Sequence, residues 1–308
     1  MKGKKEHPYY KEYKRWERSF ETYLKSQKRY REKTIISYLG LFFHFFCWIK
    51  EEGIIYKEKI GYNDLLSYRN HCREKGNKKS SINQKLSVVG LWLNMLIQRG
   101  KRKDNPARDL YFRKVSKRLP SNIIPVKELE ETLKNFPIET LADVRDKLLF
   151  SLMIYQGIIK AGELESIVTS DVDLTEGKLY IHESAKANTR LLELKASQII
   201  ILQQYLGNTR PAILALTGKK TEQLFISLGA GSRLANTLAY CLRKINKLNP
   251  LLQSREQIKS SVLADYLKNH NIREAQYFAG HKWVSSTERY KDVTLYDLHE
   301  KLQKVHPF

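Results

Sequence analysis

The chain has 308 residues, of which 42% are hydrophobic, enough to bury the cores of two ordinary domains. Its formal net charge of +22 at pH 7 exceeds what solubility requires and favours a polyanionic partner such as nucleic acid, although a solvated basic face, a ribosomal protein or a membrane-surface protein also fits charge alone. Its three cysteines form no C-x-x-C pair, which argues against a disulfide framework or a zinc site and indicates a reducing cytoplasm.

No membrane association is expected from the sequence. The longest apolar run, Leu39 to Ile49, is interrupted by His44 and is shorter than the ~20 residues that cross a bilayer. The charged residues at the start of the chain are not followed by an apolar segment, so we expect no secretory signal.

Most of the positive charge lies in the first third of the chain. Residues 1–120 contain 30 Lys and Arg against 12 Asp and Glu, a net charge of +18 out of the total +22. Residues 1–33 interleave basic and aromatic side chains, a composition suited to phosphate contacts, and we interpret them as a partly helical, basic aromatic extension. The aromatic positions are Tyr9, Tyr10, Tyr13, Trp16, Phe20, Tyr23 and Tyr30.

Three helical patterns follow the extension. Apolar residues recur at helical spacing over 35–49, a shorter helix is predicted over 63–74, and a third apolar face runs over 82–97 with Ser80 or Ser81 as its N-cap. Each pattern is followed by a glycine suited to end a helix: Gly53, Gly76 and Gly100. Together with the helix of the extension, these patterns predict a compact, basic four-helix domain.

The second half of the chain contains a different mixture of elements. Lys101 to Pro125 is rich in Lys, Arg and Pro and has no apolar periodicity, so we interpret it as the region of an interdomain linker. An apolar helix is predicted over 145–159 and a β-hairpin over 178–194, with helices in the remainder. The predicted fold is mainly α with a small β-sheet. Its predicted parts are the extension 1–33, a helical domain 34–112, a linker 113–125 and an α+β domain 126–308.

The segment from Asn271 to His281 has strong local signals. Asn271 and Glu274, three residues later, form a capping box that starts a helix. Gly280 is suited to the left-handed conformation that ends one. His281 is therefore expected on a sharp bend after this helix.

A second capping box is predicted immediately afterwards. Ser285 and Glu288 have the required spacing, which places Tyr290 in the second turn of a new helix. The N-terminal end of a helix carries positive partial charge and stabilises a phosphate. Tyr290 is thus predicted close to a site suited to an anion.

These residues carry a resemblance to a known family. Ala279-Gly280-His281, with Tyr290 nine residues after the histidine at the end of Ser-Ser-Thr-Glu-Arg-Tyr, resembles the Leu-Gly-His and Thr-x-x-Tyr closing motif of the tyrosine recombinases, also called phage-type integrases. Gln156 to Leu164 resembles the family's Thr-Gly-Leu-Arg-x-Ser-Glu-Leu box, and Glu256-Gln-Ile-Lys259-Ser-Ser falls where His-x-Leu-Arg-His-Ser is expected. Residues 34–53 and 80–109 are similar to the family's helical, SAM-like core-binding domain.

The resemblance implies a mechanism. In this family a tyrosine hydroxyl attacks a DNA phosphate, which gives a 3′-phosphotyrosine and a free 5′-hydroxyl, and because the ester conserves the bond, neither ATP nor a metal cofactor is implied. It also implies a role for each matching residue. Tyr290 is the nucleophile, Lys186 in the hairpin turn the general acid, and His281 a phosphate stabiliser, while Lys160 and Lys259 occupy the two arginine positions and Glu256 occupies the middle histidine position.

This sequence departs from the family pattern at the two arginine positions. Lysine keeps a positive charge but lacks the planar fork that braces two phosphoryl oxygens, and an ionised Glu256 would repel a phosphate. Arg255 and Arg289 are adjacent and could supply a fork in a shifted register. Three hypotheses follow: a site-specific recombinase, a DNA-binding relative without catalysis, and a topoisomerase with the same phosphotyrosine chemistry.

The resemblance also implies the partners. Strand exchange needs double-stranded DNA and paired sites, so a homo-oligomer, a tetramer on DNA, is expected. The tail after Tyr290 has apolar residues at helical spacing that either pack on their own domain or dock on a neighbouring protomer: Leu295, Leu298, Leu302 and Val305. The DNA target, and whether a phage, transposon, integron or chromosome is served, do not follow from the sequence.

Overall fold

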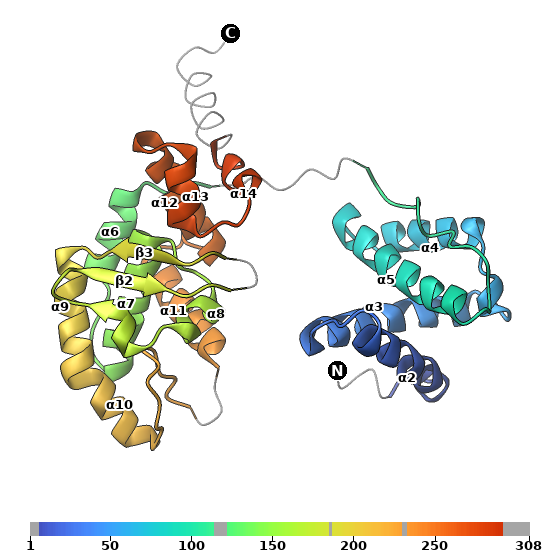
Figure 1. Cartoon of the computed structure of the whole chain (residues 1–308), viewed down its shortest axis with the longest axis horizontal. Helices are drawn as coiled ribbons and strands as arrows, with labels where there is room; N and C mark the ends of the chain where they lie inside the picture. The colour runs from blue at the N-terminus through green and yellow to red at the C-terminus, as the bar shows by residue number, and fades with distance from the viewer. Residues whose placement is uncertain (1–5, 114–121, 185–186, 230–232, 292–308) are drawn as a thin grey trace, which may run out of the picture. The chain divides into compact units, whose positions relative to one another are not determined.

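A computed structural model of the chain describes residues 6–113, 122–184, 187–229 and 233–291. The chain divides into two compact units, Met1–Lys117 and Arg118–Phe308, which Figure 1 shows with their helices and strands. The fold is mainly α with one small sheet, as predicted from the sequence. Among the described residues, no helix is long and apolar enough to cross a membrane.

The described residues of the N-terminal unit form a bundle of four helices and one short 3-10 turn. The elements are α2 (Tyr10–Ser26), α3 (Glu32–Glu51), η1 (Lys57–Lys59), α4 (Tyr62–Glu74) and α5 (Lys79–Gln98). The helical patterns found in the sequence correspond to these helices. The expected serine cap of the last helix is wrong, because α5 already begins at Lys79 with Lys78 as its N-cap and therefore contains both serines.

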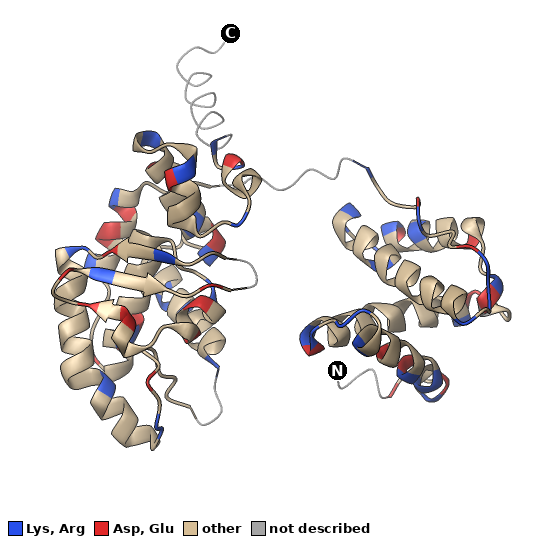
Figure 2. Ribbon diagram, in the orientation of Figure 1, with Lys and Arg blue, Asp and Glu red and all other residues tan. Residues whose placement is uncertain are grey.

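Aromatic side chains fill the core of the N-terminal unit. Helix α2 presents Tyr13 and Phe20 to this core at helical spacing, where both are fully buried beside Phe42 of α3. The Tyr13 hydroxyl donates a hydrogen bond of 2.7 Å to the carbonyl of Leu39. Part of the basic aromatic extension thus packs as core. Basic residues occur on every helix of this unit, so its charge is spread over all of them (Figure 2).

The C-terminal unit surrounds one buried helix. Helix α7 (Leu141–Gln156) has buried residues on all its faces, starts at a capping box of Thr140 and Asp143, and ends at Gly157 with φ +64°. The other elements are α6 (Val126–Lys134), α8 (Ala161–Ser166), η2 (Thr169–Asp171), β1 (Val172–Asp173), β2 (Lys178–Ile181), β3 (Arg190–Glu193), α9 (Ala196–Gln204), η3 (Tyr205–Thr209), α10 (Arg210–Thr217), α11 (Leu234–Leu248), α12 (Arg255–Asn269), α13 (Ile272–Ala279) and α14 (Val284–Glu288).

The predicted hairpin is confirmed as β2 and β3. The three strands form an antiparallel sheet in the order β1-β2-β3, with Ile181 opposite Arg190 and Leu179 opposite Leu192. Alternate residues of β3 are buried, which places Arg190 and Leu192 on the inner face. The sheet therefore brings a charged side chain into the interior of the unit.

The first of the two predicted capping boxes is confirmed. The Asn271 side chain accepts the amide of Glu274 at 3.0 Å, and the carboxylate of Glu274 accepts the amide of Asn271 at 3.1 Å. Gly280 ends α13 with φ +65°, the conformation that a glycine reaches without steric cost. His281 follows on the bend, as expected.

The second predicted capping box is wrong. The carbonyl of Trp283 accepts the amide of Ser286, so α14 begins at Val284 and Ser285 lies inside the helix. Helix α14 ends at Glu288, and Tyr290 lies just beyond it in a turn in which its amide donates to the carbonyl of Thr287. Tyr290 is therefore held by a turn after a short helix and not by the first turns of a new one.

We expect Asn271→Ala to destabilise α13, because the substitution leaves the amides of Arg273 and Glu274 without their side-chain acceptor. Loss of an N-cap costs ~1 kcal/mol, which corresponds to about fivefold faster amide exchange by local opening. Hydrogen-exchange mass spectrometry of peptides over residues 272–279 measures the effect. Asn269→Ala, at an exposed position two residues earlier, serves as the control and should leave exchange unchanged.

Candidate active site

Four of the six residues proposed from the sequence lie around one site in the C-terminal unit. Lys160 is the N-cap of α8, Lys259 lies on α12, and His281 and Tyr290 flank α14. The rings of His281 and Tyr290 stack with centroids 6.1 Å apart and planes within 18°. The charges of Lys259 and Lys160 both act on His281. The fold thus brings together residues that are up to 130 positions apart in the chain.

Lys186 lies outside the described residues, but the neighbouring turn of the hairpin is placed. Ala187 pairs with His281 in an antiparallel bridge, and the amide of Asn188 donates to the carbonyl of Gly280 at 3.1 Å. The described end of the hairpin turn is therefore attached directly to the bend that carries His281.

Glu163 is a buried carboxylate between two cations. Its side chain is 2% exposed, with Oε1 3.5 Å from Nζ of Lys160 and Oε2 3.4 Å from Nη2 of Arg190. Arg190 was not among the residues proposed from the sequence. The signal that could have found it is the alternation of β3, which places this arginine on the same inward face as Leu192.

Lys259 is buried at the centre of the site. Its side chain is 6% exposed, and its Nζ donates a hydrogen bond of 3.1 Å to the carbonyl of Ala279. Burial lowers the pKa of Lys259 to about 8; Glu163 opposes this effect, and Lys160 and Arg190 add to it. Lys259 therefore gives up its proton more readily than an exposed lysine.

His281 is a neutral imidazole at neutral pH. Burial, with the cations Lys259, Lys160, Arg190 and Arg289 around it, lowers the pKa of His281 to about 3. Its Nδ1 shares a hydrogen bond of 2.9 Å with the hydroxyl of Thr287, which is fully buried. A ring oriented in this way offers its other nitrogen to a ligand as a neutral hydrogen-bonding group.

Tyr290 is protonated in the absence of a ligand. Burial raises the pKa of its hydroxyl, while the Arg289 charge and the Ser260 hydroxyl act in the opposite direction. Glu256 raises it further through its charge, although this residue lies on the exposed side of α12. Of the two adjacent arginines, Arg255 is anchored to the carbonyl of Ile159, just before Lys160, by a bond of 2.8 Å from Nη1.

The arrangement is suited to an anion. Lys160, Lys259 and Arg190 carry positive charge around the buried carboxylate of Glu163, while the imidazole of His281 is neutral. A buried excess of cations is stabilised when a negatively charged group enters. A tyrosine hydroxyl beside such a group is placed to attack it once deprotonated.

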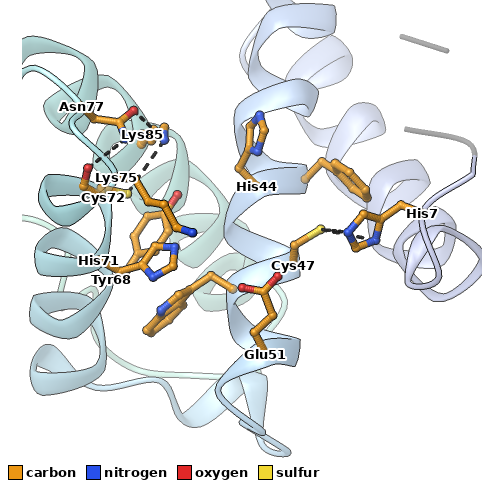
Figure 3. A pocket seen from close by; sticks show the side chains of 12 residues that line it. His7, His44, Cys47, Glu51, Tyr68, His71, Cys72, Lys75, Asn77 and Lys85 are labelled. Atoms are coloured by element: carbon orange, nitrogen blue, oxygen red, sulfur yellow. Dashed lines mark hydrogen bonds between the residues drawn. The ribbon is translucent and has the colours of Figure 1, made fainter. Parts of the chain in front are cut away.

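A separate pocket of about 360 Å³ lies in the N-terminal unit (Figure 3). His7, Cys47, His71 and Cys72 line it, and Sγ of Cys47 lies 3.9 Å from the ring nitrogens of His7. Within the described ranges, no group of three His, Cys, Asp or Glu residues could hold a metal ion. Burial raises the pKa of Cys72, so this thiol is a poor nucleophile.

Comparison with known families gives matches in both halves of the chain. Residues 123–295 match the phage integrase family, and residues 18–100 match the phage integrase N-terminal SAM-like domain. Tyrosine recombinase XerC of Bacillus subtilis strain 168 is 26% identical over 291 residues, covering 94% of this chain and 95% of that protein.

Solved structures share the fold. XerH site-specific recombinase bound to a palindromic difH substrate has a TM-score of 0.70 and 17% identity, covering 88% of this chain and 79% of that one. A lambda integrase tetramer bound to a Holliday junction has a TM-score of 0.60 and 16% identity, covering 89% of this chain and 76% of that one.

The lowered pKa of His281 predicts a loss of stability in acid. Between pH 6.5 and about 3, the unfolded chain binds a proton at this residue and the folded chain does not, so stability falls as the pH falls through this range. The slope reaches at most ~1.4 kcal/mol per pH unit. His281→Asn keeps a polar group but does not titrate in this range. In this variant, the stability of residues 272–291, measured by hydrogen exchange, should depend less on pH between 6.5 and about 3. His270→Asn, at an exposed position, should leave this pH dependence unchanged.

Proposed function

Because the chain belongs to the phage integrase family, we propose that it recombines DNA at specific sites, with Tyr290 as the nucleophile that attacks a DNA phosphate. The observation that carries the proposal is the position of Tyr290, stacked on His281 within a site of excess positive charge. The match to the XerC recombinase along 94% of this chain supports the same conclusion.

The proposed reaction is two transesterifications. The Tyr290 hydroxyl releases its proton to water, and its oxygen forms a bond to phosphorus while the bond from phosphorus to the 5′-oxygen breaks. The leaving 5′-oxygen takes up a proton, for which we propose Lys186 as the donor. The 3′-phosphotyrosine keeps the energy of the broken bond, so attack by a 5′-hydroxyl of the partner strand rejoins the DNA and releases Tyr290.

The other residues proposed from the sequence each have a proposed place in this reaction. Lys160 and Lys259 stabilise the negative charge that the phosphoryl oxygens gain in the transition state. His281, as a neutral ring, donates or accepts one hydrogen bond at the same phosphate. Glu256 stands where the family has histidine, and we propose that it lies beside the phosphate without contacting it, because its side chain is on the exposed side of α12.

We propose double-stranded DNA as the partner and a homotetramer on paired sites as the active assembly. The helical domain 34–112 and the catalytic domain 126–308, joined by the linker 113–125, would both contact one duplex. Net charge of +22 supports contacts dominated by phosphates, with binding that weakens steeply as salt rises. The apolar tail proposed for docking on a neighbour lies outside the described residues, and the DNA-bound tetramer among the structures of this fold supports the oligomeric state.

The nucleophile is tested with nicked suicide duplexes that carry the DNA flanking the gene. We expect a covalent protein–DNA adduct, and Tyr290→Phe should abolish it because phenylalanine has no attacking oxygen. Tyr240→Phe, at an exposed position of α11, should leave the yield unchanged.

The other outcomes of this assay separate the hypotheses. An adduct that survives Tyr290→Phe contradicts the assigned nucleophile. Binding of these duplexes without an adduct identifies a DNA-binding relative without catalysis, a reading consistent with lysine at both arginine positions. Relaxation of supercoiled plasmid without recombined product identifies a topoisomerase.

The role of Lys160 is tested by Lys160→Arg. The side chain is 41% exposed, which leaves room for a guanidinium, and one additional charge-assisted hydrogen bond to the phosphate is worth ~1.5–3 kcal/mol. We expect the rate of adduct formation to rise about tenfold or more. Lys178→Arg, a similarly exposed lysine on β2, is the matched control. An unchanged rate in Lys160→Arg with intact DNA binding would show that this position does not brace the phosphate.

A further inference from the structure

Arg190 is a buried cation to which the proposed reaction assigns no role. It begins β3 and is 1% exposed. Its guanidinium makes long contacts only: Nη2 lies 3.4 Å from Oε2 of Glu163, Nη1 lies 3.5 Å from the carbonyl of Asn188, and Nε has no hydrogen-bond partner among the described residues. A guanidinium costs considerable free energy to bury with such incomplete pairing. This cost calls for a function that a neutral side chain would not perform.

The guanidinium also packs against the bend that carries His281. A Cβ atom added to Gly280 would overlap Nη1 of Arg190 and would lie 2.8 Å from its Cζ. Gly280 is therefore required for two reasons, its φ of +65° and the space that Arg190 occupies. Arg190 consequently contacts three elements at once: Glu163 of α8, Asn188 of the hairpin turn and Gly280 of the bend.

We propose that Arg190 is a positioning residue that holds Lys160, the hairpin turn and His281 around a single phosphate. The contact with Lys160 runs through Glu163, whose two oxygens face the two cations. The contact with the hairpin turn is the carbonyl of Asn188, and the contact with His281 is the backbone of Gly280 just before it. The proposal rests on the proposed function, since it assigns Arg190 to the same phosphate site.

The charge of Arg190 supports this position. Lys259 is surrounded by Glu163 and Lys160 at the start of α8, Arg190 on β3 and His281 on the bend, and Arg190 lowers the pKa of both Lys259 and His281. A guanidinium does not lose its proton at any pH at which the protein is folded. Arg190 thus supplies a fixed positive charge beside Lys259, which can titrate.

The test compares Arg190→Met with Arg190→Lys in the full-length chain. Arg190→Met removes the fork and the charge, and we expect adduct formation on the nicked suicide duplex to fall by ~10² or more while DNA affinity stays unchanged. Arg190→Lys keeps the charge without the fork and should show a smaller loss, about tenfold. A variant that binds DNA normally but reacts slowly separates positioning from a general loss of fold.

A second measurement does not depend on cleavage. In protein labelled with ¹³Cε-lysine, the resonance of Lys259 is assigned by its loss in Lys259→Met and titrated by NMR. The wild type should titrate near pH 8, Arg190→Met should titrate higher because one repelling charge is gone, and Arg190→Lys should remain close to the wild type. A purely structural role for Arg190 would not produce this difference between the two variants.

The outcomes are distinguishable from those of the proposed function. If the wild type forms no adduct, the proposed cleavage fails, and the Lys259 titration still decides whether the charge of Arg190 acts on the site. A folded Arg190→Met variant with the wild-type rate and the wild-type Lys259 titration would overturn the role of Arg190. If Arg190→Met does not fold, Arg190→Lys decides: a slower reaction supports positioning by the fork, and a wild-type rate contradicts it.

Discussion

The buried carboxylate of Glu163 is the interaction on which the candidate active site depends. Cations converge on it from the start of α8 and from β3, and a third, Lys259, lies close enough for Glu163 to stabilise its charge. Without this carboxylate, the buried Lys259 and Arg190 would lie close to each other and to the more exposed Lys160 with no counter-charge from α8. The Glu163 carboxylate balances one of these positive charges, and the remaining positive charge is available to stabilise a phosphate. Burial, together with the cations nearby, lowers the pKa of His281 and keeps its ring neutral.

Much of this site follows from local sequence, because local rules fix the backbone around it. The capping box at Asn271, the left-handed Gly280 and the β2–β3 hairpin depend on neighbouring residues, and the structure has all of them. The interval between His281 and Tyr290 carried the resemblance. The cap at Ser285 failed because the same residue types also occur inside helices, and the hydrogen bond from the Ser286 amide to the Trp283 carbonyl starts α14 at Val284 instead. Arg190 was missed because its role arises from contacts with residues far away in the chain, at Glu163 and Gly280.

Lysine at positions 160 and 259 changes the character of the site more than its charge. Arginine would remain protonated at every relevant pH, whereas burial brings the pKa of Lys259 to about 8. The electrostatic strength of this site therefore varies within the physiological range of pH. Lys259 also donates a hydrogen bond to the carbonyl of Ala279, so fewer of its N–H groups can donate to a phosphate. The proposed nucleophile thus stays in place, while the stabilisation that we propose for its target becomes weaker and dependent on pH.

The missing side chain of Gly280 has an evolutionary consequence. The volume that a Cβ would fill is occupied by the guanidinium of Arg190, and Lys259 bonds to the carbonyl of the preceding residue. Substitutions at positions 190, 259 and 280 are therefore not independent, because each changes the space or charge that the other two experience. A larger residue at 280 requires both a shorter residue at 190 and a change from the left-handed backbone conformation, and a guanidinium at 259 would lie close to the one already at 190. The order in which mutations arise, and not only their identity, determines which active sites descendants of this chain can reach.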